Sequence, residues 1–137
     1  MELHPATVHF PIALLITSGI AWIIYFFKPL DVFKDVAFWL HTFGLIGVGL
    51  AILTGNLEIP VDIEEAGQQL LETHEILGYT IAWLFLMLWL WHYFRKDNMQ
   101  PKELVAFAVL YILSLSFVVW TSYIGGKLVY EYGAGIS

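Results

Sequence analysis

The sequence predicts an all-α integral membrane protein, built as a four-helix antiparallel bundle with both termini on the outer, periplasmic side. Three observations predict this fold class: the composition, four long apolar runs and an uneven distribution of basic residues. Of the 137 residues, 59% are hydrophobic and 13% are charged, and the mean hydropathy is +0.74. Soluble domains are about half apolar and about one quarter charged. The composition therefore indicates a chain that lies mostly within the bilayer.

Four apolar runs define the predicted spans. The predicted helices cover residues 8–27, 36–54, 74–94 and 103–124. Each run has the roughly 20 residues that cross the hydrocarbon core as a helix, and helices satisfy their own backbone polar groups in lipid. The sequence predicts one domain over residues 1–137, with an outer loop at 55–73 and a C-terminal outer cap at 125–137.

Local signals refine the two outer segments. In the outer loop, Asp62 followed by Glu65 is typical of a capping box. Apolar residues at helical spacing follow it, so we expect a short amphipathic helix on the outer surface. At the other segment, Gly125 and Gly126 predict the end of the fourth helix, because consecutive glycines commonly follow a helix terminus.

The basic residues predict the orientation. The connections after the first and third helices hold five of the six Lys and Arg residues: Lys28, Lys34, Arg95, Lys96 and Lys102. The positive-inside rule places these two connections in the cytoplasm. We therefore predict a multi-pass membrane protein, in contact with lipid and without a nucleic-acid partner.

The chain has five histidines and no cysteine. The absence of cysteine excludes disulfides, iron–sulfur clusters, c-type haem attachment and thiolate zinc sites. Every histidine falls on or just beyond an apolar run, where an ionisable side chain is costly and usually functional. Bound iron or another metal is therefore the first hypothesis.

Three of the histidines belong to the outer side. His9 and His74 fall at the outer edges of the first and third helices, and His4 lies slightly beyond them. A b-type haem needs two imidazoles from different helices at similar depth, with small side chains beside the macrocycle. Gly78 and Ala13 provide such positions one turn from His74 and His9. The pattern predicts haem ligation by His9 and His74.

The other two histidines, His41 and His92, belong to the inner leaflet and differ in depth by about one helical turn. They predict a second haem site that is less strongly supported than the first. An alternative stays open for each: His41 hydrogen-bonded to a hydroxyl such as that of Ser114, and His92 as an interfacial residue.

The chain opens with the phrase His4-Pro5-x-x-Val8-His9-Phe10-Pro11-Ile12-Ala13, and Gly125-Gly126-x-Leu128-Val129-Tyr130 stands near its end. With Thr54-Gly55 and His74, these motifs resemble a bacterial family of predicted membrane proteins, domain-of-unknown-function 2231, over nearly the whole chain. The resemblance implies a four-helix protein of the bacterial cytoplasmic (inner) membrane, with its motifs on the outer face and a redox or haem role. The family usually carries an Asp shortly after the second-helix glycine, whereas this chain has Gly55-Asn56-Leu57-Glu58.

These observations favour a small b-type cytochrome-like electron-transfer module without independent catalysis. It would serve as a subunit of a larger respiratory or photosynthetic redox complex, with one haem and a second at the inner pair as a further hypothesis. Two alternatives stay open. One is a cofactor-free structural or assembly subunit. The other is a divalent-metal site built from His4, His9, His74 and a carboxylate such as Glu75, because imidazole suits zinc, copper and iron.

Overall fold

The computed structural model describes residues 3–57 and 62–134, and all secondary structure in these ranges is helical. The helices are α1 (Leu3–Thr7), α2 (His9–Phe27), α3 (Asp31–Leu57), α4 (Glu65–Arg95) and α5 (Pro101–Tyr130). Within these ranges, four segments are long and apolar enough to cross a membrane, with α1 and α2 together forming the first. The predicted all-α, four-span class is therefore confirmed.

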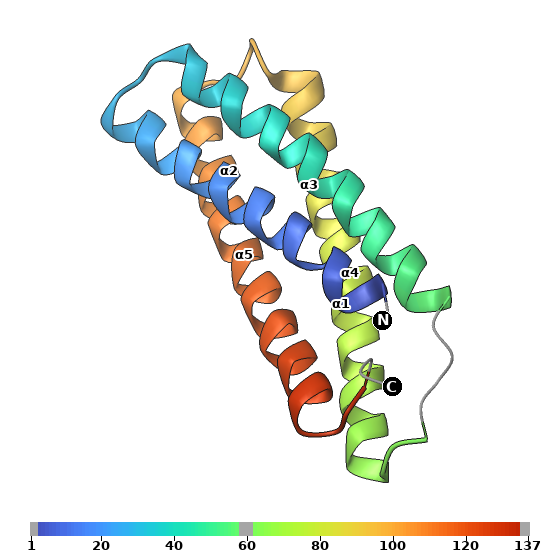
Figure 1. Ribbon diagram of the computed structural model, residues 1–137. Coiled ribbons are helices and arrows are strands. Elements are labelled where there is room, and N and C mark those ends of the chain that lie inside the picture. The colour runs from blue at the N-terminus through green and yellow to red at the C-terminus, as the bar shows by residue number, and fades with distance from the viewer. Residues whose placement is uncertain (1–2, 58–61, 135–137) are drawn as a thin grey trace.

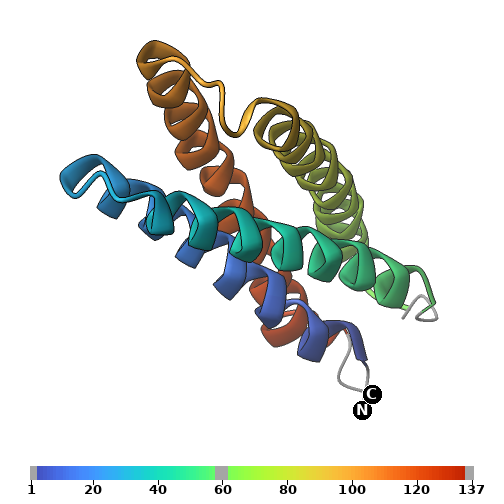
Figure 2. The ribbon, with the colours of Figure 1, turned by 90° about the horizontal axis from the view of Figure 1, so that it is seen from above.

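The helices form two antiparallel pairs (Figure 1). Helix α2 packs along α3, and α4 packs along α5. The two pairs meet where α3 contacts α4 and α2 contacts α5, and they cross at an angle when viewed from above (Figure 2). Helix α1 and the last turn of α5 lie at one end of the bundle, which we call the histidine end. The connections at 28–30 and 96–100 lie at the other, which we call the basic end. Which end faces the periplasm stays a prediction.

The first span is interrupted at Val8, which separates α1 from α2. The Val8 N–H still donates to the His4 carbonyl at 3.1 Å. Proline at position 11 has no N–H, so it cannot donate to the Thr7 carbonyl, and this lost bond accounts for a break at this point. The interruption places His4 on a short helix of its own beside α3.

Glycines bring α2 and α3 close together. A Cβ at Gly44 would lie 2.8 Å from Leu15 Cδ2, and a Cβ at Gly47 would lie 3.0 Å from Pro11 Cβ. Lipid chains are as apolar as core side chains, so helix association in a membrane depends on such close packing. Large side chains that do not enter the bundle, such as that of Trp83, are exposed and are positioned to contact lipid.

The third span begins earlier than predicted. Residues 65–95 form one continuous helix, so the predicted separate surface helix is wrong, and that segment is the first part of α4. The predicted capping box is also wrong: Glu64 is the N-cap and makes no side-chain capping bond. Gly67 does not break the helix. Instead, a Cβ at this position would lie 2.8 Å from the Tyr132 ring, so the glycine allows the segment after α5 to pack against α4.

The fourth span ends later than predicted. Helix α5 continues through Gly125 and Gly126 to Tyr130, so the prediction that these glycines end the helix is wrong. Their backbone hydrogen bonds stay helical, and the missing side chain of Gly125 makes room for a ring on α4. A Cβ at Gly125 would lie 3.0 Å from His74 Cε1.

Candidate histidine site

His4 is held against α3 by a backbone hydrogen bond. Its Nδ1–H donates to the Ala51 carbonyl at 2.8 Å, and Thr54 Oγ1 lies 3.4 Å from the same nitrogen. The ring lies over Gly55, where a Cβ would be only 3.1 Å from Nδ1. Thr7 and Thr54 add a contact of 3.1 Å between their hydroxyl oxygens. The short helix α1 is thus attached to the last turns of α3.

His74 makes the equivalent arrangement between α4 and α5. Its Nδ1–H donates to the Thr121 carbonyl at 3.2 Å, and its ring packs on Gly125. His4 and His74 therefore share a pattern, in which a glycine on the neighbouring helix admits the ring and a backbone carbonyl holds its Nδ1.

The two rings meet at the histidine end. The centroids of the His4 and His74 rings lie 6.1 Å apart, and the ring planes are nearly perpendicular, at 86°. Both side chains are half-buried. A carbonyl oxygen can only accept a hydrogen bond, so in the neutral form each imidazole carries its proton on Nδ1 and its lone pair on Nε2. Histidines that ligate metals commonly have this arrangement, in which the other ring nitrogen donates to a carbonyl.

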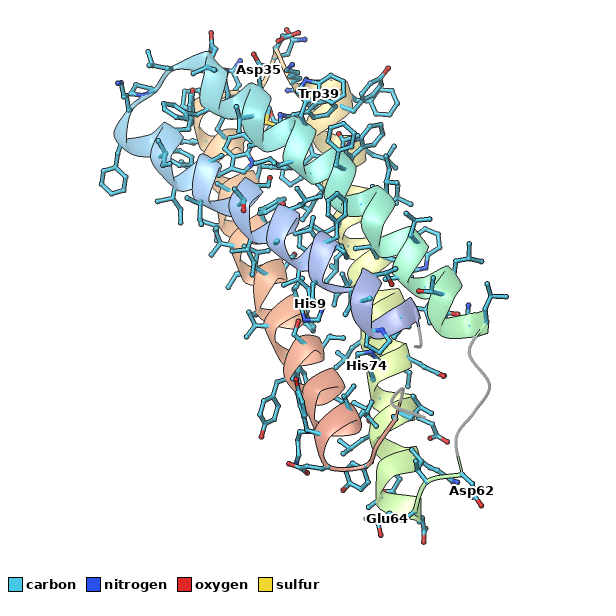
Figure 3. The ribbon with its side chains drawn as sticks, viewed as in Figure 1. His9, Asp35, Trp39, Asp62, Glu64 and His74 are labelled. Carbon is cyan, nitrogen blue, oxygen red and sulfur yellow. The ribbon has the colours of Figure 1, made fainter. Side chains whose placement is uncertain are left out.

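His9 lies apart from this arrangement. Figure 3 shows His9 on α2 and His74 on α4, both toward the histidine end. The His9 side chain is exposed, and its Nδ1–H donates to the Pro5 carbonyl one turn earlier, at 2.8 Å. This bond is local to the start of the chain and ties His9 to no other span.

The donors at this end form a pair and not a larger cluster. Within residues 3–57 and 62–134, no three His, Cys, Asp or Glu side chains are grouped so that they could hold a metal ion. Glu75 is exposed. The site therefore offers two imidazoles.

The inner histidines lie in the aromatic core nearer the basic end. His41 is fully buried, and its Nε2–H donates to the Phe85 carbonyl at 2.9 Å. The expected partner, Ser114, instead donates to the Leu110 carbonyl, so a backbone carbonyl takes the place of the hydroxyl. The His41 ring also packs edge-on against Tyr111.

His92 is 1% exposed and is enclosed by rings from three other helices: Trp22, Phe38 and Phe107, with centroids 5.0 to 5.3 Å away. It is therefore a core residue and not an interfacial one. Nδ1 of His41, Nδ1 of His92 and Nε1 of Trp22 are buried and have no hydrogen-bond partner among the described residues. Aromatic side chains occupy the space around both inner histidines.

The sequence grouped His4 with His74 only in the divalent-metal alternative, together with His9. The haem prediction paired His74 with His9 instead, because His4 lies slightly beyond the predicted first helix. The signal that points to the pair is the position of the two glycines, since Gly55 and Gly125 each lie beneath one of the rings.

The fold and this site define a four-helix membrane protein with a histidine pair at one end of the bundle. A family model described as "Predicted membrane protein (DUF2231)" matches residues 1–137. The chain therefore belongs to the DUF2231 family of predicted membrane proteins. No curated protein and no solved structure matches it.

Proposed function

We propose that the protein binds one b-type haem at the histidine end, held by His4 and His74, and that it transfers electrons within a membrane redox complex. The observation that supports this proposal is the 6.1 Å separation of the two ring centroids, with each Nδ1 held by a backbone carbonyl. Both rings are thus oriented through Nδ1 by a carbonyl, as is common for histidines that ligate metals through the other ring nitrogen.

The separation suits two imidazoles on one metal ion. With metal–nitrogen bonds of about 2.0–2.1 Å, the ring centroids lie about 5 Å apart for a tetrahedral angle and about 6.4 Å apart for a linear one. The observed separation of 6.1 Å lies between these two values and is therefore short enough for one metal ion to bind both imidazoles.

The number of donors also favours haem over a bare ion. Structural zinc takes four protein ligands and catalytic zinc takes three, whereas the described residues offer a pair of imidazoles here. Haem supplies four nitrogens from its own macrocycle and needs only axial ligands from the protein. A haem held by two histidines would supply electron transfer and would leave no site on the iron for a substrate.

This proposal keeps His74 from the sequence prediction and takes His4 in place of His9. His9 is exposed and bonded within its own turn, whereas His4 lies against His74. Ligation by His9 stays a prediction that the same experiment tests.

A second function, that of a cofactor-free assembly subunit, is favoured by the same hydrogen bonds. The His4 bond ties α1 to α3 and the His74 bond ties α4 to α5, so both histidines could serve as structural links alone.

The test is the haem content of the protein purified after expression with ample haem supply, measured per chain by the pyridine haemochromogen absorbance. About one haem per chain supports the electron-transfer proposal. A well-folded, monodisperse protein without haem would overturn it and favour the assembly subunit.

A further inference from the structure

An apolar groove runs between α2 and α5 toward the basic end. It has a volume of about 330 Å³ and is lined only by apolar side chains, among them Trp22 and Phe26 of α2 and Val105, Val109 and Leu113 of α5. The two helices pack against each other (Figure 1), and both belong to segments able to span a membrane. In the bilayer, such a groove is filled by a lipid chain or by a helix of another protein.

The charges at the basic ends of α2 and α5 favour a lipid over a helix of another protein as the occupant of the groove. Four of the six basic side chains form ion pairs within the chain: Lys34 with Asp31, Arg95 with Glu103, Lys96 with Asp35, and Lys127 with Glu131. The other two, Lys28 and Lys102, are exposed and make no ion pair with any described residue. Lys28 directly follows α2, and Lys102 is the second residue of α5. Each helix that lines the groove therefore carries an uncompensated cation at its basic end.

We propose that this groove binds one anionic phospholipid from the leaflet at the basic end. One acyl chain lies along Phe26 and Val109, and the headgroup phosphate is attracted by Lys28 and Lys102. Basic residues at a membrane surface attract anionic headgroups, and lysine binds phosphate as a point charge through flexible donors. The proposal does not depend on haem, because the groove and the histidine pair lie toward opposite ends of the bundle.

The headgroup is tested by native mass spectrometry of the detergent-purified protein titrated with phosphatidylglycerol or with phosphatidylcholine. The wild type should bind one phosphatidylglycerol at least about tenfold more tightly than phosphatidylcholine. The double variant Lys28→Gln/Lys102→Gln should reduce this preference to about twofold or less. Lys34→Gln/Lys96→Gln removes the same charge from the same end, but from cations that are already paired, and should keep the preference. Equal binding of both lipids by the wild type, or an equal loss in both double variants, would overturn the proposal.

The groove is tested by filling it. Val109 is 52% exposed and lines the groove, whereas Val119 is 59% exposed on the same helix and does not. Val109→Trp should weaken phosphatidylglycerol binding about tenfold, and Val119→Trp should leave it unchanged. Unchanged binding in Val109→Trp would overturn the proposal. A lipid-free wild-type dimer that Val109→Trp dissociates and Val119→Trp does not would overturn it in favour of a second copy of the chain.

Discussion

The imidazole rings of His4 and His74 lie 6.1 Å apart and nearly perpendicular, although one belongs to the first short helix and the other to the third span. Each ring is held through Nδ1 by a carbonyl of a further helix. Four helices, α1, α3, α4 and α5, thus converge on one pair of side chains. The pair lies between the two antiparallel halves of the bundle, and a cofactor site at this end would need ligands held as rigidly as these.

The glycine beneath His74 gives the first prediction. Alanine normally stabilises a helix relative to glycine by about 0.5–1 kcal/mol. Gly126→Ala should show this gain in thermal unfolding in detergent, because no atom of the described residues outside the adjoining backbone lies within 4 Å of its added Cβ. Gly125→Ala should be less stable than Gly126→Ala by about 1–3 kcal/mol, because its Cβ would press on the His74 ring. Equal stability of the two variants would mean that His74 is not confined by Gly125.

The orientation gives the second prediction. The histidine end should face the periplasm, and the connections at 28–30 and 96–100 should face the cytoplasm, because the latter carry most of the basic residues. The chain has no cysteine, so single cysteines at Glu65 and Asn98 can be probed on intact cells with a membrane-impermeant thiol reagent. Labelling is expected at position 65 and not at 98. The reverse pattern would show that the bundle is inserted the other way.

The inner histidines give the third prediction. A haem at His41 and His92 would have to displace the aromatic rings that pack on them, among them Phe85 and Phe107. We therefore expect one haem per chain, unchanged in His41→Leu and in His92→Leu. His41→Leu should cost only about 1 kcal/mol of stability, because the Phe85 carbonyl keeps its helical hydrogen bond. Two haems in the wild type, falling to one in either variant, would instead establish the inner pair as a second site.

Much of the fold could be predicted from the sequence, because bilayer thickness and backbone hydrogen bonding leave few choices for apolar runs of this length. The helix ends could not be predicted as well. Gly67 and Gly125 look like helix breakers in the sequence, but in the structure they are positions where Tyr132 and His74 pack against a helix backbone. Such packing depends on a distant segment, which local patterns do not contain.

The candidate site was also only partly predictable, because it depends on contacts between segments that are distant in the sequence. The sequence indicated the histidine end and His74, but its haem prediction favoured His9 over His4 because His4 lies slightly beyond the predicted first helix. The interruption of the first span at Val8 and the 2.8 Å bond to Ala51 place His4 beside His74.

The most direct test of the central claim is the dithionite-reduced minus oxidised absorption spectrum of the purified wild type and of three single variants. The wild type should show the Soret and α bands of low-spin b-type haem. These bands should disappear in His4→Ala and in His74→Ala and persist in His9→Ala, with the circular dichroism of all four proteins confirming intact helices. A wild type without haem bands, or bands that persist in His4→Ala and disappear in His9→Ala, would contradict the assignment of His4 and His74 as the haem ligands.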